Sequence, residues 1–230
     1  MQNPAPTHYH QFRQALFEHS LLMMEAILGR KGRVIDLGAG HCQFAIIAHE
    51  MGWEATALDV RPDRKPSLPA QVKYISADVN SDVWNAQDYD VISCLGLYYH
   101  LDQAMQHRLL DRCSGVPMIL DTHFSNPDAP SHTFGNTLSQ VYEKNGEWGA
   151  DFMEAPGVSD DQRKKDMLLA SHDNQTSWWQ TKADLTKTLH ERGWPHTWVM
   201  DFIDMNRLQR TFWLCLSIDS ERDRKTSIRI

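Results

Sequence analysis

The apolar positions at the start of the chain follow two different periods. Between residues 8 and 28 they recur every three or four positions and stop at Gly29, which predicts a leading helix over residues 8–29. Residues 33–38 are a short apolar run that ends in glycine, and residues 41–51 return to helical spacing. The predicted order is therefore helix, strand, glycine turn and helix.

The alternation of short apolar runs with helical stretches continues along the chain. Four further runs are expected to be strands, at residues 55–59, 72–76, 89–95 and 116–121. A helix is expected between the last two, at residues 102–112. Because strands that alternate with helices are typical of a parallel sheet covered on both faces, the pattern predicts a doubly wound α/β domain.

The pattern disappears after the fifth predicted strand. Residues 122–173 are polar and contain glycine and proline over a length that exceeds an ordinary connection, so we expect a lid or substrate-binding insertion there. A helix is predicted at 181–193, followed by two strands at 197–203 and 209–218 that are close enough to form a hairpin. The whole prediction is one domain over residues 1–230, with a mostly parallel seven-stranded sheet and an antiparallel C-terminal hairpin.

Composition narrows the class of protein. With 230 residues, 41% of them hydrophobic, the chain suits one globular domain with a full core. We find no apolar run of about 18 residues and no N-terminal signal pattern, so we expect a cytoplasmic protein without a membrane partner. The net charge is −7 and the basic residues are scattered, which does not favour a nucleic-acid partner. The four cysteines form no CxxC pair and are expected to be reduced thiols.

The strongest local motif is Asp36-Leu-Gly38-Ala-Gly40-His-Cys42, between the first predicted strand and the next helix. Glycines let the backbone turn sharply and approach a ligand, and the helix N-terminus offers free N–H groups to a nucleotide-like molecule. Asp59 ends the second predicted strand, about twenty residues on, where a carboxylate accepts hydrogen bonds from a ribose diol. A dinucleotide-dependent oxidoreductase fits these features almost as well.

Three details favour another class. Asp36 stands two positions before the first glycine, Gln43 replaces the third glycine of GxGxxG, and no second nucleotide-binding half follows. The motif resembles the D/E-x-G-x-G-x-G signature of class I S-adenosylmethionine-dependent methyltransferases, with Cys42 in place of the last glycine. The resemblance extends over roughly residues 30–218 and implies a Rossmann-like methyltransferase fold with S-adenosyl-L-methionine as cofactor.

The resemblance also implies which residues bind this cofactor. Asp59 falls at the position of the ribose-binding acid, Asp78 at that of the acid near the adenine amine, and residues 93–97 where backbone passes the methionine moiety. The simpler alternatives are that Asp36 caps the neighbouring helix, that Asp59 only ends a strand and that Asp78 is a turn residue. The candidate cofactor-binding residues are Asp36, Gly38, Ala39, Gly40, Asp59, Val60, Asp78, Val79, Cys94 and Leu95.

Residues 96–101 resemble the G-L-x-Y-H-L stretch of a methyltransferase subgroup that includes small-molecule enzymes and a tRNA wobble-uridine branch. Methyl transfer requires alignment of the acceptor and, for a hydroxyl, removal of a proton. His100 and His123 follow strand ends and are the candidate general bases, and Tyr99 is a candidate for orienting the acceptor. Alternatively, these histidines only hydrogen-bond their loops and proximity alone suffices.

Aromatic residues in and near the insertion either wall an acceptor from water or pack the insertion on the body. The candidate substrate-binding residues are Tyr98, Trp148, Phe152 and Trp178. The fourth predicted strand ends without a carboxylate, so we expect a metal-independent enzyme. The leading hypothesis is methylation of an oxygen or nitrogen of a small-molecule acceptor. The alternatives are a tRNA- or nucleotide-modifying methyltransferase and a non-catalytic S-adenosylmethionine-binding regulatory subunit. The oligomeric state stays open.

Overall fold

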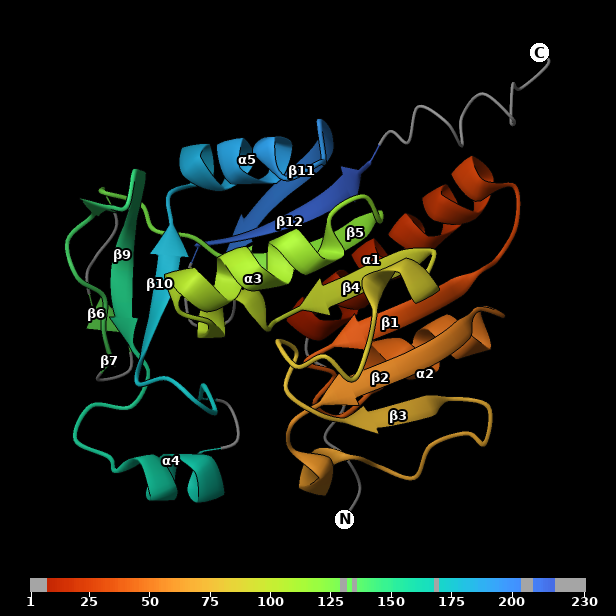
Figure 1. Ribbon diagram of the computed structural model, residues 1–230, viewed down its shortest axis with the longest axis horizontal. Helices are drawn as coiled ribbons and strands as arrows, with labels where there is room; N and C mark the ends of the chain where they lie inside the picture. Colours follow the sequence, from red (N-terminus) through yellow and green to blue (C-terminus); the bar gives the residue numbers. More distant parts are fainter. Residues whose placement is uncertain (1–7, 129–131, 134–135, 168–169, 204–208, 218–230) are drawn as a thin grey trace.

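The computed structural model describes residues 8–128, 132–133, 136–167, 170–203 and 209–217. The chain forms one large sheet with helices on both faces and a smaller sheet beside it (Figure 1). Within these residues, no helix combines the length and the apolar character that a membrane span requires.

The large sheet has seven strands in the order β11-β12-β5-β4-β1-β2-β3. Their bounds are β1 (Arg33–Leu37), β2 (Glu54–Asp59), β3 (Lys73–Ser76), β4 (Val91–Leu95), β5 (Met118–His123), β11 (His196–Ile203) and β12 (Gln209–Leu216). Strands β1 to β5 pair in parallel, whereas β12 runs antiparallel to both β5 and β11. The predicted seven-stranded sheet with its antiparallel C-terminal hairpin is confirmed, although residue 218 lies outside the described residues.

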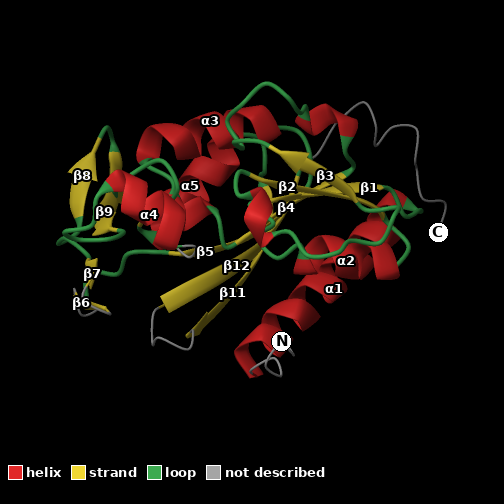
Figure 2. Cartoon of the chain, turned by 90° about the horizontal axis from the view of Figure 1, so that it is seen from below, coloured by secondary structure: helices red, strands yellow, loops and turns green. Residues whose placement is uncertain are grey.

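Helices cover both faces of this sheet (Figure 2). The helices α1 (His8–Leu28) and α2 (Gln43–Glu50) pack on one face, and α3 (Gln103–Cys113) and α5 (Lys182–Glu191) pack on the other. Successive strand side chains point to opposite faces, so Val34 joins the core under α1 and α2 while Ile35 joins the core under α3 and α5. The continuous apolar strands of the sequence are therefore buried on both sides.

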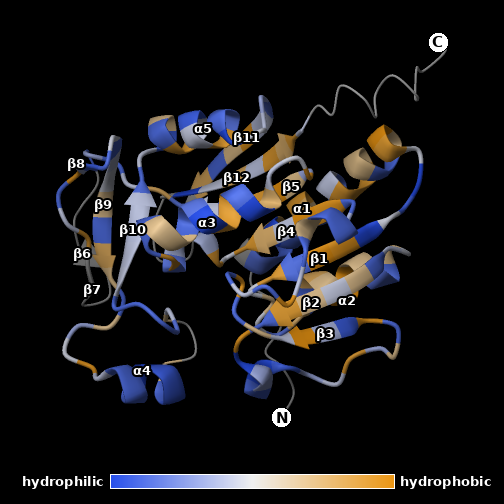
Figure 3. Ribbon diagram, viewed as in Figure 1, coloured by the Kyte–Doolittle hydropathy of each residue, from blue (hydrophilic) through white to orange (hydrophobic). Residues whose placement is uncertain are grey.

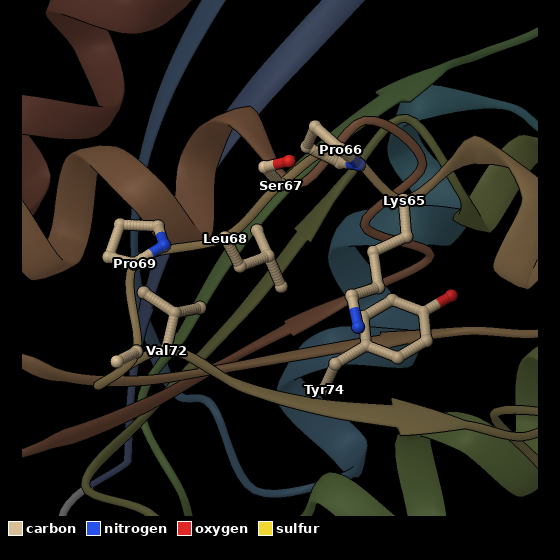
Figure 4. Close-up of a pocket in the computed structure, with 8 residues that line it drawn as sticks. Lys65, Pro66, Ser67, Leu68, Pro69, Val72 and Tyr74 are labelled. Carbon is tan, nitrogen blue, oxygen red and sulfur yellow. The ribbon is translucent and has the colours of Figure 1, made fainter.

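The crossover from β2 to β3 has no α-helix, although all of its residues are described. Pro62, Pro66 and Pro69 fall in this connection, and proline removes a backbone donor and clashes inside a helix. Only the short 3-10 helix η1 (Pro62–Arg64) forms. A surface hollow of about 700 Å³ remains beside β3, where Lys65 lies over the ring of Tyr74 (Figure 4). Its lining contains neither a carboxylate nor a histidine.

The insertion after β5 forms its own small sheet. Its strands are β8 (Tyr142–Lys144), β9 (Glu147–Met153) and β10 (Thr176–Gln180), all antiparallel, with β9 in the middle. The rest of the insertion contains the short strands β6 (His132–Thr133) and β7 (Asn136–Thr137) and the helix α4 (Asp160–Asp166), which is hydrophilic throughout (Figure 3). The small sheet therefore extends past residue 173, the predicted end of the insertion, to Gln180.

Hydrogen bonds attach this insertion beside the carboxyl ends of the parallel strands. The 3-10 helices η2 (Ala86–Asp88) and η3 (Tyr98–His100) precede and follow β4. The Trp178 amide donates to the Leu101 carbonyl just after η3 at 2.9 Å, and the Ser125 amide just after β5 donates to the Gln180 carbonyl at 2.9 Å. Figure 1 shows the arrowheads of β1, β2 and β4 pointing toward the insertion, so any site at these strand ends lies next to it.

Candidate functional site

The turn after β1 is built from left-handed backbone. Gly38 and Gly40 have φ of +66° and +52°, and Cys42 has φ of 58°. A Cβ added at Gly38 would lie 2.8 Å from the Cβ of Leu97, so the turn packs directly on the segment after β4. Burial, followed by the charges of two nearby aspartates, raises the pKa of the Cys42 thiol to about 11. Cys42 is therefore a protonated thiol in a backbone conformation that favours glycine.

Asp36 is buried near the end of β1. Its Oδ1 accepts a hydrogen bond from the Ser93 hydroxyl at 3.1 Å, and its Oδ2 is buried without a hydrogen-bond partner among the described residues. Burial raises the pKa of Asp36 to about 7; the Ser93 hydrogen bond opposes this rise and the charge of Asp59 adds to it. The glycine turn therefore lies beside a carboxyl group that retains unused hydrogen-bonding capacity.

We expect Asp36→Asn to change how stability depends on pH. With a folded pKa of about 7 and an ordinary value of 3.8, the folded chain holds a proton that the unfolded chain releases between these values. Stability contributed by Asp36 is therefore lost as pH rises through this window, by about 1.4 kcal/mol per pH unit, and the variant lacks this loss. Urea unfolding between about pH 4.5 and 6.5 measures the difference. A difference between the two proteins that stays constant with pH would contradict the expectation.

Asp59 connects the end of β2 to the glycine turn. Its Oδ2 accepts from the Gly40 amide at 2.8 Å, and its Oδ1 accepts from the Arg61 amide at 2.7 Å. Each carboxylate oxygen has a second lone pair, so both can still accept from a ribose diol. The guanidinium of Arg64 covers Gly40, with Nη2 2.8 Å from where a Cβ would stand. The glycine at position 40 thus lets the Arg64 guanidinium approach the backbone closely, and it also allows the left-handed conformation of the turn.

Asp78 follows β3, and its Oδ1 accepts from the Asn80 amide at 2.6 Å. Partial burial raises its pKa, and the Asp173 carboxyl of the insertion raises it further. Because β1, β2 and β3 are adjacent and parallel, Asp36, Asp59 and Asp78 lie along one edge of the sheet. Arg61 reaches the insertion at this edge and donates to the Ala170 carbonyl at 3.0 Å. The structure therefore brings together the three acids predicted to bind a cofactor.

The remaining predicted cofactor residues offer mainly backbone. Val79 and Cys94 have buried side chains in the core under α3 and α5, and burial raises the pKa of the Cys94 thiol well above its usual range. Leu95 is buried under α1 and α2. Ala39 donates its amide to the Leu58 carbonyl at 3.0 Å, and Val60 is half-buried just beyond β2.

Four rings join the insertion to the end of β5. Trp179 stacks on His123 at 4.8 Å and on Phe152 at 4.5 Å between ring centroids. Tyr99 meets His123 edge-on at 4.4 Å, and the guanidinium carbon of Arg210 lies 4.9 Å from the Tyr99 ring centroid. The Trp179 indole N–H donates to the Tyr99 carbonyl at 3.0 Å. This aromatic cluster fixes the insertion on η3.

Two aromatic residues predicted to bind substrate face elsewhere. Trp178 meets Tyr142 edge-on at 5.4 Å and is 1% exposed, on the side of β10 opposite Trp179. The Tyr98 hydroxyl donates to Gln180 Oε1 at 2.8 Å inside the core, where burial raises the Tyr98 pKa well above its usual range. Neither side chain lies in the aromatic cluster, and their role in substrate binding stays a prediction. Trp148 is 50% exposed, on the same face of β9 as Phe152.

Trp179 of this cluster was not among the residues predicted from the sequence, although it adjoins Trp178. Its signal was the adjacent pair Trp178-Trp179, because neighbouring strand residues face opposite sides. Which of the two faces the aromatic cluster depends on the pairing of β10 with β9, which places Trp179 opposite Ala150.

His100, a predicted base, contacts an acid that the sequence did not single out. Its Nδ1 lies 2.9 Å from Oε1 of Glu154, which follows β9. His123, the other candidate, has its Nε2 3.2 Å from Nη1 of Arg210. An arginine only donates, so the lone pair of this His123 nitrogen is engaged by a cation.

Asp121 at the end of β5 holds two arginines from distant segments. Arg13 of α1 donates its Nε to Oδ2 at 2.5 Å, and Arg210 of β12 donates to the same oxygen from Nη2 at 3.1 Å and to Oδ1 from Nε. Burial alone would raise the pKa of Asp121, but the charges of Arg13 and Arg210 outweigh it and lower the pKa. This buried cluster ties α1 and β12 to the end of β5.

Within the described part of the chain, no group of three or more histidine, cysteine, aspartate or glutamate side chains could hold a metal ion. Metal independence stays a prediction.

Comparisons with known proteins agree on one fold. Residues 9–196 match the family described as Methyltransferase domain. Similar solved structures include the N-terminal domain of EvdMO1 with S-adenosylhomocysteine and D-fucose, at 16% identity and a TM-score of 0.62, over 88% of this chain and 82% of that chain. Another is magnesium protoporphyrin IX methyltransferase from Synechocystis PCC 6803 with bound S-adenosylhomocysteine, at 13% identity and a TM-score of 0.55, over 94% and 90% of the two chains.

A third is the Burkholderia thailandensis 1,6-didemethyltoxoflavin-N1-methyltransferase with its acceptor and S-adenosylhomocysteine bound. It has 15% identity and a TM-score of 0.54, over 95% of this chain and 94% of that chain. At such identities the likeness concerns the fold alone. A search of the curated proteins found no match.

Proposed function

The chain belongs to the Methyltransferase domain family, and on that premise we propose that it transfers a methyl group from S-adenosylmethionine to an oxygen or nitrogen of a small molecule. The observation that carries the proposal is the row of Asp36, Asp59 and Asp78 at one edge of the sheet, next to a glycine turn in left-handed conformation. Ligands of open α/β sheets bind at this edge. The solved neighbours hold S-adenosylhomocysteine or S-adenosylmethionine.

The residues at this edge fit that cofactor. Asp59 has lone pairs left for the ribose hydroxyls, and Asp78, just beyond β3, would accept from the adenine amine. The buried, unpartnered Oδ2 of Asp36 and the backbone of residues 93–97 would face the methionine moiety. When bound, S-adenosylmethionine supplies the methyl group on a positively charged sulfur. The protein's own task is then to align the acceptor and to move a proton.

The acceptor would lie where η3 meets the insertion. Tyr99, Phe152 and Trp179 provide aromatic surface there, and the Tyr99 hydroxyl lies 3.8 Å from where a Cβ on Gly96 would stand, beside the end of β4. His100 is the better candidate base, because the Nε2 of His123 already faces a guanidinium. The insertion thus acts as a lid over the acceptor. Neighbours of this fold are methyltransferases named for 1,6-didemethyltoxoflavin and for magnesium protoporphyrin IX.

Calorimetric titration tests the proposal. We expect S-adenosylmethionine and S-adenosylhomocysteine each to bind at one site per chain, and NAD to give no heat of binding. S-adenosylhomocysteine should also raise the unfolding temperature of the chain, because a ligand that binds the folded state stabilises it. Binding of NAD in place of S-adenosylmethionine would overturn the proposal and favour an oxidoreductase.

A further inference from the structure

We infer that Glu154 makes His100 a general base for a hydroxyl acceptor, by holding the ring hydrogen on Nδ1 and leaving the Nε2 lone pair to take the acceptor's proton. The inference rests on the proposed function and narrows it, since it selects oxygen over nitrogen as the methylated atom. Glu154 is a positioning residue in this scheme, and His100 is the catalytic one.

The first support is the burial of the pair. The Glu154 side chain is 2% exposed and the His100 side chain 19%, with 2.9 Å between Oε1 and Nδ1. Glu154 belongs to the insertion, whereas His100 belongs to η3 of the main domain, 54 residues earlier. A buried carboxylate is costly unless it is hydrogen-bonded or paired. Its contact with His100 is therefore part of how the insertion docks.

The second support is the set of donors around Glu154. The Ser177 hydroxyl donates to Oε1 at 2.8 Å, and the Ser171 amide donates to Oε2 at 3.3 Å. Both carboxylate oxygens thus accept from donors other than histidine, as an ionised carboxylate does, since it has no hydrogen to give. With Glu154 ionised, the Nδ1 of His100 is the donor in this contact. In a neutral imidazole the remaining nitrogen, Nε2, is an acceptor.

The third support is the position of that acceptor nitrogen. None of the described residues hydrogen-bonds Nε2 of His100, and this atom is not among the buried unpartnered atoms, so it is open to a ligand. The ring lies 4.2 Å from that of Tyr99. It follows Leu97, whose side chain packs on Gly38 of the glycine turn. His100 therefore stands between the predicted cofactor edge and the aromatic cluster.

The chemistry explains why such a base suits a hydroxyl. The acceptor oxygen forms a bond to the methyl carbon as the sulfur–carbon bond breaks, and the bonding pair stays on sulfur. The hydroxyl proton passes to Nε2, and the imidazolium formed is stabilised by the Glu154 carboxylate 2.9 Å away. A neutral amine already has a free electron pair and can attack before it loses a proton. A carboxylate buried to hold this tautomer therefore favours an oxygen nucleophile.

The chain supplies a matched control pair. Glu147 on β9 accepts from Nε2 of His107 on α3 at 2.8 Å, and from Gln103 and Thr188. This second histidine–glutamate pair also joins the insertion to the main domain, but it uses the opposite ring nitrogen and involves none of the residues in the proposed site. Glu147→Gln therefore makes the same chemical change at the opposite end of β9 without touching His100.

The decisive experiment reads the hydrogen position directly, with S-adenosylhomocysteine bound to the full chain. Long-range ¹H–¹⁵N spectra at a pH where imidazoles are neutral distinguish the two tautomers, and His100→Gln identifies the signal of His100. We expect the hydrogen on Nδ1 of His100. A hydrogen on Nε2 would overturn the inference while leaving the proposed function intact, whereas failure of S-adenosylhomocysteine to bind would overturn the proposed function itself.

Turnover provides the second measurement, with matched aromatic probes that differ only in a hydroxyl or an amino group. We expect methyl transfer to the hydroxyl probe, with kcat lowered about tenfold by Glu154→Gln and KM for both substrates unchanged. Glu147→Gln should leave kcat within about twofold. Equal losses in the two variants, or transfer to the amino probe but not to the hydroxyl probe, would contradict the inference.

Discussion

Asp121→Ala is expected to lower the free energy of unfolding by about 3 to 5 kcal/mol, the usual cost of removing one member of a buried ion pair. Asp121 is fully buried, and the side chains of Arg13 and Arg210 are only 12% and 4% exposed. Without the carboxylate, two guanidinium groups would face each other in a site with little water. Because Arg13 lies on α1 and Arg210 on β12, both segments should loosen from the end of β5.

Urea unfolding of wild type and variant at neutral pH measures this loss. Asp201→Ala is the matched control, since Asp201 on β11 pairs with Lys182 but the two side chains are 47% and 40% exposed. An exposed pair contributes about 1 kcal/mol or less, so this control should remain close to wild type. Similar losses in the two variants would show that the buried Asp121 cluster contributes no more to the free energy of unfolding than an exposed ion pair does.

The architecture could be predicted because each strand of the large sheet has a recognisable pattern in its own residues. The run at 33–38 and the glycines after it require a strand that ends in a tight turn, and β1 spans Arg33–Leu37. Parallel pairing of β1 with β2 then follows from the helix α2 between them. Parallel strands end at the same edge of the sheet, so acids near the ends of these strands lie close together. Asp36, Asp59 and Asp78 do lie at that edge. This half of the candidate site therefore needed no knowledge of distant contacts.

The acceptor half could not be predicted, because it depends on how the insertion docks. Strand β8 is short and largely polar, so no period-2 pattern reveals it, and β10 joins the small sheet only through pairing with β9. Whether Trp178 or Trp179 faces η3 is decided by that register, and Glu154 becomes visible only when the insertion brings it to His100. Local propensity has no information about a contact across 54 residues of chain.

Asp59→Ala is expected to weaken binding of S-adenosylhomocysteine about 100-fold, or by about 3 kcal/mol, if Asp59 accepts both ribose hydroxyls. Hydrogen bonds to a charged group contribute about 1.5 to 3 kcal/mol each, and two would be lost. The variant also removes the acceptor of the Gly40 and Arg61 amides, so the glycine turn loses its support from β2. Both effects lower the affinity for S-adenosylhomocysteine.

Two comparisons separate these effects. Asp63→Ala removes an exposed acid from the same connection and should leave affinity within about twofold of wild type. Asp59→Asn keeps a side-chain oxygen that can accept from one amide, so its affinity should lie between wild type and Asp59→Ala.

S-adenosylhomocysteine should raise the unfolding temperature of wild type and of Asp63→Ala, and hardly that of Asp59→Ala at the same concentration, because ligand stabilisation follows affinity. Unchanged affinity in Asp59→Ala would remove this carboxylate from the cofactor site and leave the glycine turn and Asp36 to hold the ligand.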